Sequence, residues 1–222
     1  IVLIITAVIQ LGIYWLIYGR LAFYRHNKDG QAASPVSVII CARNESDCLK
    51  KYLPAVLEQD YFSFEVIVVN DCSWDETDLL LIELSKKYSN LKIVTIQEQE
   101  KYRHGKKFAL TLGIKAAANE ILILTDADCI PPGKNWLTLM QRNFTSEKEI
   151  VLGYGGYSKE KGLINKLIRF DTFFIGMQYL SSALIGNAYM GVGRNLAYKK
   201  SLFFRNKGFA KHNHILSGDD DL

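Results

Sequence analysis

The sequence lacks the motifs that would assign it to several common ligand-binding classes. Its four cysteines, Cys41, Cys48, Cys72 and Cys129, form no C-x-x-C pair, which argues against a zinc site or a disulfide framework. No G-x-G-x-x-G follows the first predicted strand, and no G-x-x-x-x-G-K-[ST] is present, so dinucleotide-binding and P-loop interpretations lose their main support. The formal net charge is +4, and no block of Lys and Arg interleaved with aromatics indicates a nucleic-acid partner. We expect free, mostly buried thiols in a reducing compartment and no nucleic-acid binding.

The N-terminal eighteen residues are almost entirely apolar. Eighteen helical residues cover about 27 Å, which is close to the hydrocarbon thickness of a bilayer. Aromatic residues end this run and Arg20, Arg25 and Lys28 follow it, a flank typical of the cytoplasmic side. A signal peptide fits poorly because no small-residue cleavage site follows. We therefore expect a transmembrane helix over residues 1–24 and a polar linker over 25–35. The next domain should face the cytoplasm from the cytoplasmic (inner) membrane.

From residue 36 onward, short apolar runs of strand type alternate with helical stretches. This alternation predicts an α/β fold with a mainly parallel sheet that helices cover on both faces. Ligands of such sheets bind at the carboxyl ends of the strands. We expect strands at Val36–Ala42, Glu65–Val69, Leu91–Ile96 and Glu120–Thr125, and helices at Asp47–Gln59, Glu76–Tyr88 and Lys106–Ala118.

Two carboxylates, Asp126 and Asp128, follow the fourth predicted strand one residue apart. Residues i and i+2 of an extended segment point the same way, so both side chains can converge on one point. Two like charges this close are costly unless a cation or a proton lies between them. Hard oxygen ligands suit Mg²⁺ or Mn²⁺, ions that are usually shared with substrate phosphates. Further polar residues, Arg43-Asn44-Glu45 and Asn70-Asp71, follow strands one and two.

Six segments taken together resemble the family 2 glycosyltransferases, which have the GT-A fold. They run in the family's order and cover residues 36–222. They are VIICARNE (Val38–Glu45), EVIVVNDCSWDET (Glu65–Thr77), GKKFALTLGI (Gly105–Ile114), ILILTDADC (Ile121–Cys129), GVGRNLAYKK (Gly191–Lys200) and SGDDDL (Ser217–Leu222). The resemblance implies an inverting, metal-dependent transferase of polysaccharide biosynthesis. It would move a sugar from a nucleotide-diphospho-sugar, a UDP-sugar above all, to a glycan or lipid-linked acceptor.

The resemblance also implies roles for individual residues. Asp71 would hydrogen-bond the nucleotide base, and Lys106 would lie near the base or the diphosphate. Asp126 would contact the ribose or the metal, whereas Asp128 would be the direct metal ligand, with Mg²⁺ or Mn²⁺ as the ion. The loop after the first strand would contact the nucleotide through Ala42, Arg43, Asn44 and Glu45.

A displacement at the sugar also needs a base that takes a proton from the attacking hydroxyl. The acidic cluster Asp219-Asp220-Asp221 is the candidate late in the chain. Its register against the family's pattern leaves both Asp219 and Asp220 open as the base. The chain begins without Met and stops directly after this cluster. We therefore expect a fragment, with the transferase domain of residues 36–222 truncated at its C-terminus.

Two alternatives belong to other functional classes. A nucleotidyltransferase would share the sheet and the acidic pair, but a Gly-rich, basic loop would be expected after the first strand. A catalytically dead, membrane-tethered nucleotide-binding protein would be expected to have lost its metal or base carboxylates, and both are present.

The stretch Gly162–Tyr189 is unusually rich in aromatic residues. We expect it to form core and the wall of the acceptor side. A position at the membrane surface, or a second spanning helix interrupted by Arg169 and Asp171, is the alternative.

Overall fold

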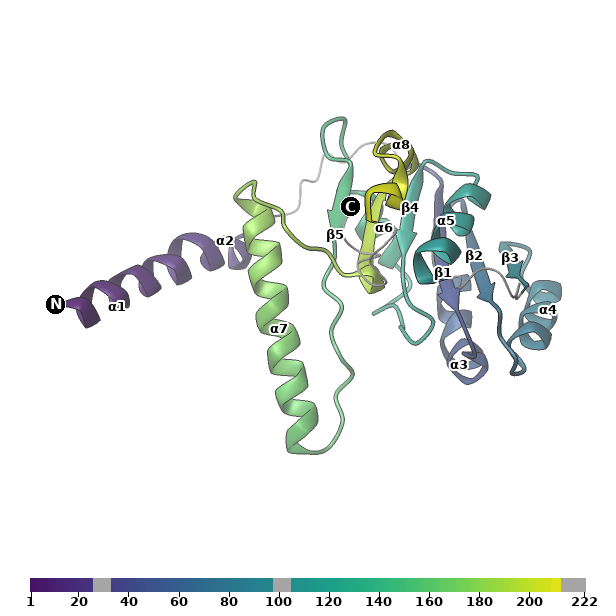
Figure 1. Cartoon of the computed structure of the whole chain (residues 1–222), viewed down its shortest axis with the longest axis horizontal. Coiled ribbons are helices and arrows are strands. Elements are labelled where there is room, and N and C mark those ends of the chain that lie inside the picture. The colour runs from purple at the N-terminus through teal and green to yellow at the C-terminus, as the bar shows by residue number, and fades with distance from the viewer. Residues whose placement is uncertain (26–32, 98–104, 213–222) are drawn as a thin grey trace. The chain divides into compact units, whose positions relative to one another are not determined.

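The computed structural model describes residues 1–25, 33–97 and 105–212 (Figure 1). Contacts within the chain define two compact units. The first comprises Ile1–Lys28 and Leu152–Val192, and the second comprises Asp29–Val151 and Gly193–Leu222. The contacts thus group an internal segment with the N-terminal helix, whereas the division at residues 24 and 35 stays a prediction.

The second unit is built on a six-stranded sheet with the order β3-β2-β1-β4-β6-β5. Strand β1 pairs in parallel with β2 and β4, β2 pairs in parallel with β3, and β4 pairs antiparallel with β6. The four predicted strands are all present, with ends that differ by no more than two residues. The strands are β1 Val36–Ala42, β2 Phe64–Asp71, β3 Leu91–Ile96, β4 Ile121–Leu124, β5 Ile150–Leu152 and β6 Leu196–Lys199.

Helices connect the parallel strands, as the alternating pattern predicts. The three predicted helices are present with boundaries that differ by no more than two residues, because helix ends fray and periodicity does not specify them. The helices of this unit are α3 Ser46–Leu57, α4 Thr77–Lys87, α5 Lys106–Ala116, α6 Trp136–Gln141 and α8 Lys200–Arg205, with short 3₁₀ turns at Gly193–Asn195 and Gly208–His212.

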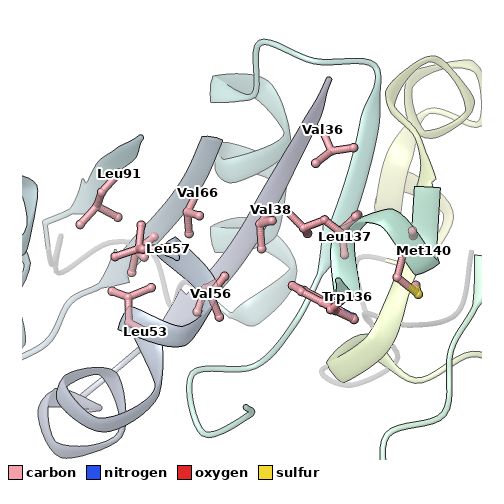
Figure 2. Packing of buried hydrophobic residues seen from close by; sticks show 14 of the residues in the cluster. Val36, Val38, Leu53, Val56, Leu57, Val66, Leu91, Trp136, Leu137 and Met140 are labelled. Carbon is pink, nitrogen blue, oxygen red and sulfur yellow. The ribbon is translucent and has the colours of Figure 1, made fainter. Parts of the chain in front are cut away.

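The core on one face of the sheet joins alternate strand residues to α3 and α6. Val36 and Val38 of β1 are fully buried in one cluster with Leu53 and Val56 of α3 and Trp136 of α6 (Figure 2). Side chains two apart on a strand share a face, which is why these valines line up. Apolar burial of this kind is the main favourable contribution to folding.

The opposite face of the sheet carries α5 at very short range. A methyl group added at Gly113 of α5 would come within 2.7 Å of Ile39 Cγ2 and 3.0 Å of Val69 Cγ2. Glycine therefore lets the helix backbone approach β1 and β2 more closely than any other residue would. This close approach packs α5, whose first residue Lys106 lines the site described below, directly against the sheet.

A buried carboxylate also joins the parallel strands. Glu65 of β2 accepts hydrogen bonds from Ser37 Oγ at 2.5 Å and Ala118 N at 2.6 Å, and its Oε2 lies 2.5 Å from Lys92 Nζ. Burial raises the pKa of Glu65, but these donors favour the charged form and lower the pKa below its usual value. The network links β1, β2, β3 and the end of α5.

The first unit contains a continuous helical run and one long helix. The run is α1 Val2–Gly12, a π-helical segment Ile13–Tyr18 and α2 Gly19–Ala22. Among the described residues, this run is the one helix that is long and apolar enough to cross a membrane. None of its residues is buried. The long helix, α7 Leu163–Leu184, packs against Ile13–Tyr18 and α2.

Helix α7 buries little of its apolar surface. Only Gly176, Tyr179 and Ser181 are buried among its residues. The expectation that this stretch forms core is therefore wrong for most of the helix. Density of aromatic residues does not by itself distinguish a core from an exposed apolar face, since both need the same side chains.

Candidate active site

A hollow of about 410 Å³ lies in the second unit where the sequence predicts a ligand site. It opens at the carboxyl ends of β1 and β2 and beside the loop after β4, because parallel strands end at one edge of the sheet. It is lined by Cys41, Ala42, Arg43, Glu45, Asp71, Gly105, Lys106, Asp126, Ala127 and Asp128. Of the predicted donor and metal residues, Asn44 alone is not in this lining.

An acidic group with metal-ligand geometry follows β4. One ligand atom each from Asp126, Asp128 and Cys129 lies within 4.8 Å of the other two. The segment turns after Leu124, and Cys129 N donates a hydrogen bond to Asp126 O at 3.2 Å. Both carboxylates are accessible and Ala127 between them is buried. Two hard oxygen donors at this spacing fit Mg²⁺ or Mn²⁺.

Lysine 106 supplies a positive charge to the same wall. Its Nζ lies 3.1 Å from Asp126 Oδ1, and both side chains are partly exposed. Lys106 is the first residue of α5 and follows Gly105, so the helix start brings the ammonium to the carboxylate. The hollow thus combines candidate metal ligands with a cation that suits a phosphate.

Asp71 ends β2 with a buried carboxylate oxygen. The residue is only 7% exposed, and its Oδ1 has no hydrogen-bond partner among the described residues. A buried acceptor without a donor is costly, so a ligand N–H that reached this oxygen would recover a hydrogen bond. The observation fits a contact from the N–H edge of a nucleotide base.

The loop after β1 is braced against the loop after β2. Asn44 N donates to Ser73 Oγ at 2.9 Å, and Trp74 N donates to Asn44 Oδ1 at 2.9 Å. Asn44 and Cys72 have positive φ values of 56° and 54°, a conformation that costs non-glycine residues free energy. Arg43 lies over the Trp74 ring, 5.6 Å from its centroid. Asn44 therefore shapes the hollow from outside its wall.

Asp75 fixes the entry of two helices behind this loop. It accepts hydrogen bonds from Ser46 N at 3.2 Å and Thr77 N at 3.0 Å, while Thr77 Oγ1 accepts one from Glu45 N at 3.1 Å. Burial raises the pKa of Asp75, but the bonds from Thr77 and Ser46 outweigh it and lower the pKa to about 2. The carboxylate is thus ionised at neutral pH and holds Ser46 and Thr77, while Thr77 Oγ1 holds Glu45 at the hollow.

The pKa values of two cysteine thiols are raised by burial and by the carboxylates of the site. Burial, followed by the charges of Asp128 and Asp126, raises the pKa of Cys129 to about 11. A hydrogen bond to Glu45, then burial and nearby carboxylates, raises the pKa of Cys48 to about 11. All four cysteines are free, as predicted, but each is half-buried: Cys41, Cys72 and Cys129 lie at a strand end or in a site loop, and Cys48 lies in the first turn of α3.

Sequence reasoning missed several residues that build this site. Cys41, Gly105 and Ala127 line the hollow, and Ser73, Asp75 and Thr77 position its loops. Their signal was weak because small residues and turn formers are common after strands. The predicted base candidates Asp219 and Asp220 lie outside the described residues.

A mainly parallel α/β sheet with a ligand-sized hollow at the carboxyl ends of its strands is the arrangement of α/β enzymes that bind their ligands at that edge of the sheet. The sequence of residues 37–205 matches the model of Glycosyl transferase family 2. The chain therefore belongs to this family.

The chain is similar to several curated proteins. It is 38% identical over 104 residues to glycosyltransferase AglE of Haloferax volcanii, and this match covers 46% of this chain and 33% of AglE. It is 29% identical over 132 residues to the poly-beta-1,6-N-acetyl-D-glucosamine synthase of Staphylococcus epidermidis, and this match covers 55% of this chain and 31% of the synthase. The chain spans about a third of the length of these relatives.

Solved structures confirm the GT-A fold. The mannosyltransferase PcManGT from Pyrobaculum calidifontis, in complex with GDP-Man and Mn²⁺, matches 94% of this chain and 56% of its own with a TM-score of 0.70 and 22% identity. Residues 1–349 of S. aureus TarS, in complex with UDP-GlcNAc, match 78% of this chain and 47% of their own with a TM-score of 0.52 and 18% identity.

Proposed function

We propose that the hollow in the second unit binds a nucleotide-diphospho-sugar together with Mg²⁺ or Mn²⁺. The observation that carries this proposal is that three kinds of chemical group meet in the wall of one cavity. Asp128 and Asp126 offer metal ligands, Lys106 offers a cation, and Asp71 offers a buried acceptor that has no partner in the described part of the chain. The complexes of similar structures with GDP-Man and with UDP-GlcNAc support a nucleotide sugar as the donor.

The whole protein would then transfer the sugar to a hydroxyl of a glycan or lipid-linked acceptor with inversion. A bound divalent ion would neutralise charge that develops on the leaving diphosphate. Asp128 and Asp126 would hold that ion, Lys106 would attract the phosphates, and Asp71 would orient the base. The resemblance of SGDDDL to the family's late acidic motif supports Asp219 or Asp220 as the base toward the acceptor.

We also propose that residues Val2–Ala22 anchor this domain in the cytoplasmic membrane. The length and apolar composition of this helix, in which no residue is buried, support the anchor. Two basic residues, Arg20 in its last turn and Arg25 after it, support a cytoplasmic position for the transferase domain.

A panel of nucleotide sugars tests the donor proposal. The whole protein should release nucleoside diphosphate from one of them with Mn²⁺ or Mg²⁺ and lose this activity in chelator. Asp128→Asn should abolish release, whereas the control Glu83→Gln, which removes one exposed charge on α4, should keep it. Release that continues in chelator would contradict the metal proposal. Formation of a nucleotide sugar from a nucleoside triphosphate and a sugar phosphate would favour a nucleotidyltransferase instead.

A further inference from the structure

A second hollow lies in the first unit and has a different chemistry from the donor site. Its volume is about 400 Å³, and it lies between helix α7 and the loop that precedes it. Two cations of α7, Lys166 and Arg169, share its wall with aromatic side chains. The lining residues are Tyr154, Gly156, Tyr157, Lys166, Arg169, Phe170 and Phe173.

The loop side of this hollow is held firmly to α7. Tyr179 donates a hydrogen bond from its hydroxyl to Gly153 O at 2.8 Å. The Tyr154 ring packs against Gly176, where an added methyl group would come within 2.7 Å of it. Asn165 donates to Ser158 O at 3.1 Å and accepts from Glu160 N at 2.9 Å. The hollow is therefore shaped by contacts on both of its sides.

The two cations are available to a ligand. Among the described residues, neither Lys166 nor Arg169 has a hydrogen bond or an ion pair. They are one helical turn apart and therefore share one face of α7. Asp171, the single acidic residue of the helix, does not line the hollow. Two unpaired cations beside tyrosine residues suit a phosphate group.

The surroundings of the hollow are apolar and uncovered. Between 42% and 75% of the surface of each of six large apolar side chains on α7 is exposed, namely Leu163, Ile164, Leu167, Ile168, Phe170 and Phe173. An apolar surface of this size needs a partner that keeps it from water. A phosphate site within such a surface fits a molecule with a charged head and apolar chains.

The position of α7 within its unit also favours a lipid. The helix packs against Ile13–Tyr18 and α2, at the end of the apolar helical run. In Figure 1, α1 and α7 run in crossing directions. If α1 spans a bilayer, a helix that crosses it at this end lies along the membrane surface, where lipid phosphates are found.

We propose that this hollow binds the phosphate headgroup of an anionic membrane lipid. Lys166 and Arg169 hold the phosphate, Tyr154 and Tyr157 lie beside it, and Phe170 and Phe173 contact the start of the acyl chains. The site is independent of the proposed donor site, which lies in the other unit. It ties the first unit to anionic regions of the membrane surface.

Lipid retention by the full chain tests this proposal. The protein is purified in a neutral detergent, and native mass spectrometry compares bound phosphatidylglycerol with phosphatidylcholine. We expect retention of phosphatidylglycerol over phosphatidylcholine. Titration with short-chain phosphatidylglycerol should show that Lys166→Gln/Arg169→Gln weakens binding roughly tenfold or more, because two charge-assisted contacts are lost. The conservative pair Lys166→Arg/Arg169→Lys should retain most of the affinity.

A matched control separates a site from general surface charge. Lys159→Gln/Lys161→Gln removes the same charge from exposed residues of the same unit that do not line the hollow. This pair should stay within about twofold of the unchanged protein, because exposed charges outside a site contribute little. Equal losses in both double variants would overturn the proposal.

Two further outcomes would also overturn it. Glycerol phosphate that binds as tightly as the lipid would show a site for free phosphate, and absence of any preference for phosphatidylglycerol would assign the apolar face to another occupant, such as a protein. Circular dichroism and binding of a nucleoside diphosphate at Asp71 check that each variant is folded. The same binding measurement distinguishes failure of this inference from failure of the proposed function.

Discussion

The ammonium group of Lys106 lies 3.1 Å from Asp126 Oδ1, so the start of α5 and the loop after β4 meet at the proposed metal site. The side chain of Lys106 thereby partly neutralises the carboxylate pair formed with Asp128. A divalent ion that entered the site would compete with this ammonium, since both are attracted to the same oxygen. A diphosphate that entered with the ion would then offer Lys106 a new partner.

Replacement of Lys106 should change metal and nucleotide binding in opposite directions. We expect Lys106→Gln to bind Mn²⁺ alone more tightly, by up to about fivefold, because an exposed ion pair contributes about 0.2–1 kcal/mol. Binding of UDP with Mn²⁺ should become weaker because a phosphate contact is lost. Electron paramagnetic resonance of free Mn²⁺ and calorimetry with UDP measure the two effects. Weaker Mn²⁺ binding without nucleotide would contradict the competition.

Replacement of Asp71 should weaken nucleotide binding without any involvement of the metal. Asp71→Asn preserves the shape of the residue but replaces half of the carboxylate with an amide donor. A hydrogen bond to a charged group contributes about 1.5–3 kcal/mol, so affinity for UDP should fall roughly ten- to a hundredfold. Calorimetry in chelator isolates this contact from metal binding. An unchanged affinity would leave Asp71 with a structural role alone.

The depressed pKa of Asp75 predicts a loss of stability in acid. Its folded pKa of about 2 is below the usual 3.8, so the ionised form contributes stability that is complete above about pH 5. This contribution is lost as the pH falls from about 5 toward 2, because the unfolded state, in which the carboxyl has its usual pKa, takes up a proton that the folded state does not. Urea unfolding at pH 7, 4 and 3 should therefore show a smaller acid effect in Asp75→Asn than in the unchanged chain. Parallel pH profiles for the two proteins would contradict the assignment.

The close approach of α5 to the sheet predicts that a single methyl group destabilises the second unit. Gly113→Ala adds helix propensity worth about 1 kcal/mol, but the new methyl group overlaps Ile39 and Val69, whose branched side chains move little. Overpacking typically costs about 1–3 kcal/mol, so we expect a lower free energy of unfolding and a lower Tm. Gly133→Ala is the control, since a methyl group there meets no atom within 4 Å. Equal Tm values for both variants would show that the contact relaxes freely.

The sequence determined the features of this protein that depend on local periodicity. The run Val36–Ala42 is β1 as predicted, and the alternation of apolar strands with helices gave the parallel part of the sheet. Asp126 and Asp128 are near one another in space because they are near one another in the chain. The rule that ligands bind at the carboxyl ends of parallel strands then placed the hollow.

Only the tertiary structure decided which distant residues act together. The bonds from Asn44 N to Ser73 and from Ser46 N to Asp75 join loops about thirty residues apart, and no local pattern encodes such a pair. The sequence likewise did not reveal that α7 packs against the N-terminal helix, or that the apolar side chains of α7 are largely exposed. Periodicity reports whether a segment has an apolar face, whereas the partner of that face is set by the packing of the whole chain.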